Sequence, residues 1–177
     1  MSVDLEVPIT REIAFAELFP MSQKIMSRML GGTNIPNLEG NELCRGEKLL
    51  LPQTLYPGFM GVVRCPFPEM PADIEFGSMQ QLFDLAERYP NAIALATIAV
   101  RRSGGDPQNL VLGASLAAAI ASICATEIVD DCTIWTKQTY TIASDFIDRL
   151  AIASPKNSFR ESVAEFVSRM TAAPHMI

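Results

Sequence analysis

The sequence predicts an α+β protein, in which a mixed sheet of about four to five strands packs against amphipathic helices and an alanine-rich central helix. Three observations carry this prediction. Apolar and polar residues alternate along Val3–Ile9, which is the period of a half-buried strand. Apolar residues recur every three to four positions in several longer segments, as on one face of a helix. The segment Leu110–Ala125 is apolar nearly all round, which is typical of a helix buried in a core.

The first third of the chain begins with the alternating strand. Pro8 indicates an edge position or the end of that strand. A first helical stretch covers about Arg11–Phe19 and is expected to be interrupted by Pro20. A clearer helix then runs over Ser22–Leu30, and the two glycines after it favour its termination.

The middle of the chain combines short apolar runs with prolines. The runs Lys48–Leu51 and Phe59–Val63 are compatible with a hairpin. The proline-rich stretch Cys65–Pro71 is an exposed connector. Ser78–Tyr89 opens with a capping-box pattern and predicts a helix. Ala92–Val100 is continuously apolar and predicts a central strand covered on both faces, although a helix fits the same run.

The last third ends in two helices. Glu127–Asp131 predicts a short strand leading into a turn, and Thr133–Tyr140 a return strand. Amphipathic patterns then predict helices over Ile142–Leu150 and Ser158–Met170, the second with a capping box. We expect one globular domain over 1–177, with a short flexible tail from about residue 173.

Composition excludes several classes of function. The chain has 177 residues, with 14 Lys and Arg against 20 Asp and Glu, so its formal net charge is −6. A nucleic-acid binder needs a basic face, and an anionic membrane surface also attracts basic segments. We therefore expect neither a nucleic acid nor a membrane as partner. The uncharged run Pro107–Thr126 has the length of a membrane span, but its alanines and polar residues favour a buried helix.

The compartment follows from the N-terminus and the cysteines. Met1–Thr10 has the features of neither the basic nor the apolar region of a signal peptide. The four cysteines form no CxxC pair, so reduced thiols are expected rather than disulfides or a zinc site. A cytoplasmic protein is the resulting expectation.

No catalytic, cofactor-binding or metal-binding residue is expected. The one histidine, His175, lies in the tail, so it is poorly placed for a catalytic triad. Asp130 and Asp131 could bind a cation, but acids in turns commonly bind their own backbone. The glycines after Arg101 and Arg102 lack phosphate-loop spacing, although the two arginines could bind a phosphate.

Acidic and aromatic residues are the candidates for partner binding. The stiff, acidic segment from Pro66 to Glu75 suits recognition of a basic protein surface, because little entropy is lost on binding. Trp135 is either an exposed interface anchor or a core residue packed on the alanine-rich helix. The methionines are either core residues or an adaptable binding surface. The candidate contacts are Glu69, Asp73, Glu75, Asp130, Asp131 and Trp135.

The order of three segments in this chain resembles that in one known family. The alanine-rich stretch Ala114–Ala125, the segment Glu127–Asp131 and then Trp135 resemble the arrangement in small cytoplasmic immunity proteins of bacterial toxin–immunity systems. The resemblance covers about a quarter of the chain and carries over no functional motif. It implies a stoichiometric inhibitor, not an enzyme, whose partner is a cognate toxin or effector.

Two alternatives stay open. One is an acidic chaperone or adaptor for a secreted effector, which would commonly be a homodimer. The other is a small-ligand-binding protein or enzyme that uses the turn at Arg101 and Arg102.

Overall fold

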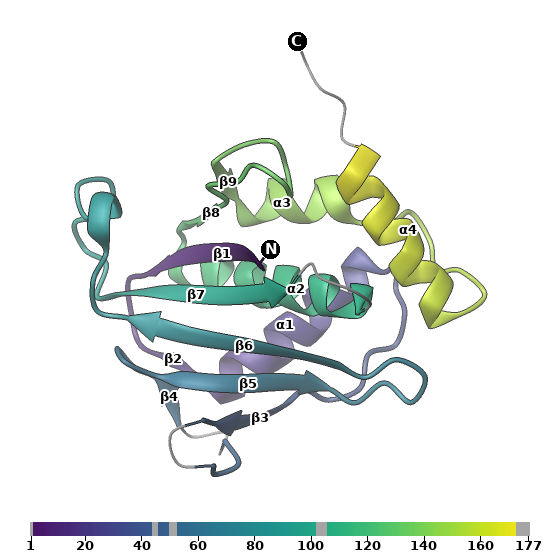
Figure 1. Cartoon of the computed structure of the whole chain (residues 1–177), viewed down its shortest axis with the longest axis horizontal. Coiled ribbons are helices and arrows are strands. Elements are labelled where there is room, and N and C mark those ends of the chain that lie inside the picture. The colour runs from purple at the N-terminus through teal and green to yellow at the C-terminus, as the bar shows by residue number, and fades with distance from the viewer. Residues whose placement is uncertain (1, 44–45, 50–52, 102–105, 173–177) are drawn as a thin grey trace.

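A computed structural model describes residues 2–43, 46–49, 53–101 and 106–172. Its main layer is a seven-stranded sheet in the order β3-β5-β6-β7-β1-β8-β9 (Figure 1). The strands are β1 (Ser2–Ile9), β3 (Glu39–Glu42), β5 (Met60–Cys65), β6 (Ala72–Met79), β7 (Ala94–Arg101), β8 (Glu127–Val129) and β9 (Tyr140–Ile142). All described strand pairs are antiparallel. The α+β class is confirmed, whereas the mixed sheet and the four to five strands were wrong.

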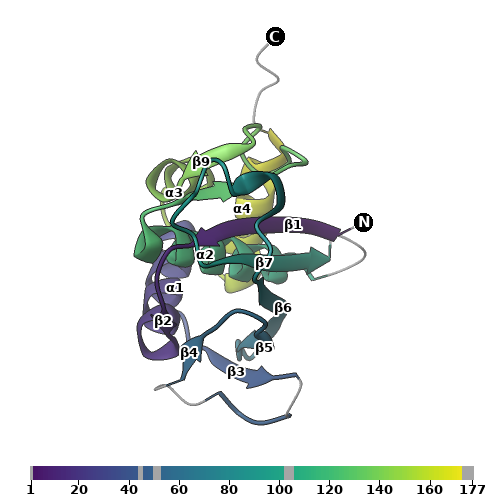
Figure 2. The ribbon, with the colours of Figure 1, turned by 90° about the vertical axis from the view of Figure 1, so that its left-hand side faces the viewer.

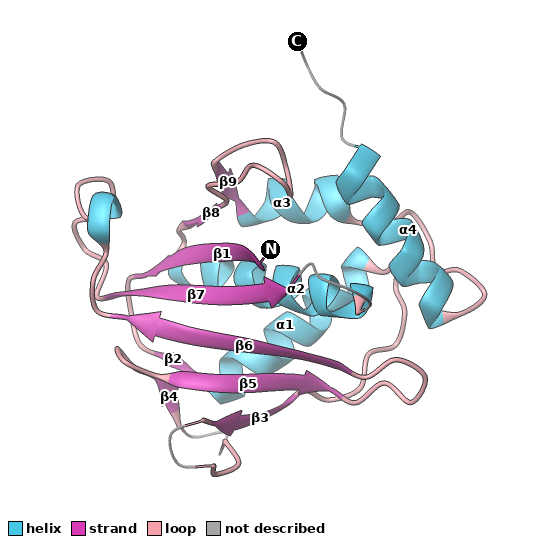
Figure 3. Cartoon of the chain, viewed as in Figure 1, coloured by secondary structure: helices cyan, strands magenta, loops and turns pink. Residues whose placement is uncertain are grey.

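The helices gather on one side of this sheet (Figures 2 and 3). They are α1 (Phe15–Met29), α2 (Pro107–Cys124), α3 (Ala143–Leu150) and α4 (Phe159–Ala172), with a short 3-10 turn η1 (Phe83–Leu85) between β6 and β7. A two-stranded sheet of β2 (Ile13–Ala14) and β4 (Thr54–Leu55) lies beside α1. The side of the main sheet that faces away from α1 and α2 is called the open face below.

The central helix is confirmed as α2. It is buried along most of its length, including every residue from Leu110 to Ala121. Gly113 lets it approach the sheet, because a Cβ there would lie 2.4 Å from Cγ2 of Val100. Among the described helices, α2 alone has the length and composition to cross a membrane, and 78% of that stretch is buried inside this fold. This burial is the behaviour of a core helix.

Helix α1 continues through Pro20, which the sequence placed between two helices. A proline inside a helix costs about 3 kcal/mol, because it removes a hydrogen bond and crowds the preceding turn. Buried residues lie on both sides of it, among them Leu18 and Ile25. The packing of these two halves against the core outweighs the cost, so the prediction of an interruption was wrong.

The segment Ser78–Tyr89, which was predicted to be a helix, does not form one. Ser78 and Met79 end strand β6, and only η1 is helical within the rest of the segment. The Ser78 hydroxyl donates to the carbonyl oxygen of Tyr56, not to a helix N-terminus. The capping-box pattern was therefore coincidental.

In the part of the chain that the structure describes, the two apolar runs predicted to form a hairpin do not pair with each other. Strand β5, formed by the second apolar run, lies between β3 and β6. Lys48, from the first run, forms a bridge to Asn41, while residues 50–52 lie outside the described part. The proline-rich connector is confirmed as the loop between β5 and β6, although β6 begins as early as Ala72.

The prediction for β7 is partly confirmed. It is the middle strand of the sheet, between β6 and β1. Its inward side chains, such as Ile98 and Val100, are buried, but Thr97 and Ala99 point to the open face and are half-buried. Helices therefore cover this strand on one face only.

The C-terminal helices are confirmed. Helix α3 begins at Ala143, and the Ser158 hydroxyl accepts a hydrogen bond from the backbone N–H of Glu161 at the start of α4. The return strand is shorter than expected: β9 covers only Tyr140–Ile142, and Trp135 lies in the preceding turns. The expected tail, with His175, lies outside the described residues.

Candidate functional site: the open face of the sheet

The open face carries polar and small side chains because strands alternate. Along β6, Ile74 and Phe76 point into the core, whereas Asp73, Glu75 and Met79 are exposed on the other side. The same alternation along β1 buries one set of residues and leaves Asp4 and Glu6 outside. The polar side chains gather on this face because successive residues of a strand point to opposite sides of the sheet.

The three acids predicted in the proline-rich segment are all exposed. Glu69 lies in the loop between β5 and β6. Asp73 and Glu75 lie on β6 instead of in a loop, so their positions are fixed by pairing with β5 and β7. A rigid strand presents these two carboxylates, which sharpens the expectation of a stiff acidic segment.

The two other acids predicted to contact a partner differ in exposure. Asp131 is exposed, but Asp130 is buried at 2% exposure, and its Oδ2 accepts the backbone N–H of Trp135 at 2.7 Å. Burial raises the pKa of Asp130, and hydrogen bonds from the backbone N–H groups of Trp135 and Ile134 partly offset the rise. Asp130 is therefore a structural residue of its turn, as acids in turns commonly are, and not a surface contact.

Trp135 is also removed from the surface. It is 1% exposed, and its ring lies 6.1 Å from that of Phe146 in α3. The core interpretation of this tryptophan is confirmed. The alternative of an exposed interface anchor was wrong, because the Trp135 side chain is buried in the core.

An apolar hollow of about 700 Å³ lies on the open face, over β5, β6 and β7. Its floor is made of the small residues Gly77, Thr97 and Ala99. Leu43 and Met60 stand beside it with 47% and 52% of their surfaces exposed. Because both residues line the same hollow, their exposed apolar surface is grouped and not scattered, as it is in many contact surfaces.

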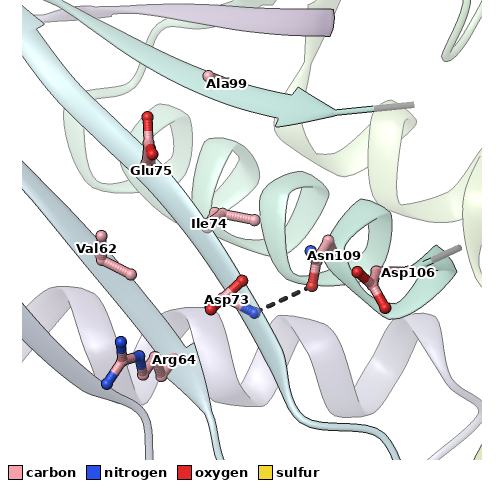
Figure 4. Close-up of a pocket in the computed structure, with 8 residues that line it drawn as sticks. All are labelled: Val62, Arg64, Asp73, Ile74, Glu75, Ala99, Asp106 and Asn109. Carbon is pink, nitrogen blue, oxygen red and sulfur yellow. Dashed lines mark hydrogen bonds between the residues drawn. The ribbon is translucent and has the colours of Figure 1, made fainter. Parts of the chain in front are cut away.

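A polar hollow of about 400 Å³ lies next to the apolar one, and Figure 4 shows the residues that line the polar hollow. Glu75 and Ala99 line both hollows, and the two neighbouring hollows together are called the trough below. At the polar end, Asn109 of α2 accepts the backbone N–H of Asp73 at 3.0 Å. The residues that line the polar hollow are Val62, Arg64, Asp73, Ile74, Glu75, Ala99, Asp106 and Asn109.

A second group of carboxylates lies beside the trough, with Asp4 and Glu6 on β1 and Asp131 after β8. Burial and then the charges of Asp131 and Asp4 raise the pKa of Glu6. Asp4 and Asp131 are therefore close enough to Glu6 to repel its charge, and the three acids are called the acidic bank below. Asp4 and Glu6 were missed as candidates, although the alternation along Val3–Ile9 already placed them together on the outer face.

The segment between β6 and β7 covers one end of the open face. Leu82, Leu85 and Tyr89 pack with Leu95 and Val129 in a small separate cluster. This segment, residues 80–93, is called the arm below.

Polar contacts hold the arm in place. Arg88 donates to Oε2 of Glu127 through Nη2 at 2.7 Å, and its guanidinium carbon lies 4.1 Å from the ring centroid of Tyr140. Tyr89 donates its hydroxyl proton to the same carboxylate oxygen. Burial alone would raise the pKa of Glu127, but the hydrogen bonds from Tyr89 and Arg88 outweigh it and lower the pKa.

The remaining features that the sequence singled out are the cysteines, possible metal ligands and the turn at Arg101 and Arg102. Cys65 and Cys124 are buried free thiols and Cys132 is an exposed one, while Cys44 lies outside the described residues. Within 2–43, 46–49, 53–101 and 106–172, no three His, Cys, Asp or Glu side chains are grouped so as to hold a metal ion. The side chain of Arg101 and all of Arg102 are likewise outside the description.

The chain was compared with protein-family models, curated proteins and solved structures, and none of them matches.

Proposed function

We propose that this protein is an immunity protein, which binds a cognate bacterial toxin in the cytoplasm and neutralises it by stoichiometric contact. The observation that carries the proposal is the open face, where carboxylates on β1 and β6 border an exposed apolar hollow. Apolar area supplies binding free energy, and the surrounding charges supply orientation and a fast encounter with a basic protein.

The rigidity of this surface supports an inhibitory role. The carboxylates of Asp73 and Glu75 stand on a strand paired on both sides, so little conformational entropy is lost when a partner docks. A toxin that acts on nucleic acid has a basic cleft, and fixed carboxylates can occupy such a cleft as phosphates do. The net charge of −6 adds long-range attraction to a basic partner.

Co-expression with the protein encoded beside this chain tests the proposal. We expect the two to purify together as a complex of defined stoichiometry, and the toxic activity of the neighbour to fall to zero at equivalence. A neighbour that does not co-purify, or that stays active in the complex, would contradict the proposal.

A chaperone or adaptor for a secreted effector is the second candidate. The exposed Leu43, Met60 and Met79 favour it, because flexible apolar side chains can hold an unfolded partner segment. The two functions differ in what happens to the partner. An adaptor keeps its client competent for export and is commonly dimeric, so a monomer in light scattering that abolishes the partner's activity favours the immunity function.

A further inference from the structure

The register of the sheet gives the trough two different sides. Across the strands, Met60 pairs with Gly77, Gly77 with Thr97, and Thr97 with Glu6. One row further along, Val62 pairs with Glu75, Glu75 with Ala99, and Ala99 with Asp4. The small residues of β6 and β7 thus lie between apolar side chains on β5 and carboxylates on β1.

The dimensions of the trough fit a helix. Neighbouring strands lie about 4.8 Å apart, so β5 and β1, three strands apart, are separated by roughly 14 Å. A helix with its side chains is about 10–12 Å across. Along β6, the distance from Asp73 to Met79 is roughly 20 Å at the rise of a strand, which corresponds to about 13 helical residues.

A polar atom at the floor has no partner. The Thr97 hydroxyl oxygen is buried without a hydrogen bond to any of the residues that the structure describes. It lies between Gly77 and Glu6 in the register, in the apolar part of the trough. A buried hydroxyl without a partner is unfavourable, so rotation of this side chain toward a polar group on an incoming segment would be favoured.

Charge disfavours a second copy of this chain as the occupant. Two copies meeting through their open faces would bring the acidic bank of one, with Asp4 and Glu6, against the acids of the other. A segment with Lys or Arg on one side would instead meet opposite charge on β1 and at Glu75.

We infer that the trough binds a basic amphipathic helix of the partner protein, with apolar side chains over Met60 and Gly77. Its Lys or Arg side chains would lie toward the acidic bank and toward Asp73 and Glu75 at the polar end. This inference rests on the proposed function, because it names the part of the toxin that the open face recognises. The helix would lie along β6 and β7, with its apolar stripe on the small residues of the floor.

Model peptides of about 14 residues test the inference. The first is built from Leu and Lys with the leucines at helical spacing. The second has the same composition with the leucines at every other position, as in a strand. The third is the first with Glu in place of Lys. Each carries a fluorescent label, and binding to the full chain is measured by anisotropy at low and at high salt.

Two variants of the chain test the floor of the trough and its carboxylates separately. Ala99→Phe fills the floor with a side chain that points away from the core. The double variant Asp73→Asn with Glu75→Gln removes two charges at the polar end. Its matched control, Asp145→Asn with Asp148→Asn, removes the same charge from exposed positions in α3, which belongs to the helical layer.

The inference expects the helical Leu–Lys peptide to bind most tightly and the Leu–Glu peptide not to bind. Ala99→Phe should abolish binding, and the Asp73/Glu75 variant should weaken it about tenfold. The α3 control should bind within about twofold of the unmodified chain, and high salt should reduce all binding. Should the strand-patterned peptide bind as tightly, or the α3 control lose as much affinity as the Asp73/Glu75 variant, the inference is wrong.

The same variants separate this inference from the proposed function. If the neighbouring toxin is neutralised equally by the unmodified chain and by Ala99→Phe, the immunity function stands and the helix site fails. If the peptides behave as expected but no neighbouring protein is inhibited, the helix site stands and the immunity function fails. Circular dichroism of each variant verifies that it is folded, and the Asp73/Glu75 variant provides the test if Ala99→Phe does not fold.

Discussion

A single hydrogen atom in place of a side chain sets the distance between α2 and the sheet. At Gly113, the helix lies against Val100, and an added methyl group would overlap that side chain. Interiors are packed as densely as organic crystals, so such an overlap must be relieved by moving the helix or the strand. Gly113 is therefore a packing residue, despite the lower helix propensity of glycine.

The first prediction concerns this contact. Gly113→Ala should destabilise the protein, because an overpacking cost of about 1–3 kcal/mol outweighs a propensity gain of about 1 kcal/mol. Urea unfolding measures the change. Val100→Ala makes room for the new methyl group, so the double variant should be less destabilised than the sum of the two single variants. Strict additivity would mean that the two side chains do not compete for space.

The second prediction concerns Glu6. Its pKa is raised in the folded state, so the folded protein holds this proton more tightly than the unfolded chain does. The stability associated with this carboxyl is therefore present below its ordinary pKa of 4.5 and is lost as the pH rises through the raised value. Glu6→Gln removes this loss. It should be more stable than the unmodified chain at pH ~7, with a difference that shrinks toward pH ~4.

Denaturant unfolding at both pH values measures this difference, with Glu12→Gln as the control. Glu12 carries the same charge but is exposed, whereas Glu6 is half-buried, so the Glu12 variant reports the general effect of removing one acid. A gain at Glu6→Gln that persists unchanged at low pH would contradict the burial and charge repulsion of the ionised carboxylate as its cause.

At the scale of elements, the arm depends on a few polar contacts. Arg88 binds Glu127 and lies over the ring of Tyr140, which connects the arm to β8 and β9. The arm itself contains only the short turn η1 and a small apolar cluster. Segments with few buried apolar contacts open locally at low free energy.

The third prediction follows for this arm. Arg88→Ala should increase amide hydrogen exchange in residues 82–92 while leaving the global melting temperature nearly unchanged, because exposed ion pairs contribute little to overall stability. Arg160→Ala, an exposed arginine of α4, is the control and should leave exchange in the arm as it was. Equal exchange in both variants would show that the apolar cluster alone holds the arm.

Elements in which the spacing of apolar residues fits only one kind of secondary structure could be predicted from the sequence. The alternation along β1 and the apolar surface of α2 each leave one stable solution, so both were found. Strand β6 also alternates, but Gly77 and Ser78 weaken its end, and the next residues happen to be spaced as in a helix. The strand and the arm share one stretch of sequence, and periodicity alone does not say where one ends.

The site was predictable only in part for a related reason. Exposed acids such as Glu75 can be recognised by type, but their neighbours come from β1 and β7 through long-range pairing. Register, which places Asp4 two strands from Glu75, depends on the whole sheet. The burial of Asp130 and Trp135 depends on the fold of one irregular turn, for which the sequence offers no periodic signal.

At the scale of the whole molecule, one apolar cluster joins the sheet to the helices. It includes Leu5 of β1, Leu116 of α2, Phe146 of α3 and Phe166 of α4. Trp135, the only tryptophan in the chain, is part of the same cluster. A core shared in this way couples the unfolding of its parts.

The fourth prediction is a single cooperative transition. Trp135 fluorescence reports the C-terminal part of the core, and far-ultraviolet circular dichroism reports all helices and strands, so the two should give the same urea midpoint. Two separated midpoints would show instead that the part containing β9, α3 and α4 unfolds independently of the main sheet.

The alternation of the sheet has a further consequence for how this protein can change over generations. In β6 the residues that stabilise the fold and the residues that meet the surroundings are interleaved one by one, yet they face opposite ways. Substitutions at Asp73 or Glu75 can therefore accumulate without cost to the core, while Ile74 and Phe76 stay fixed between them. The exposed residues of this strand can therefore change while the residues that hold the fold stay the same.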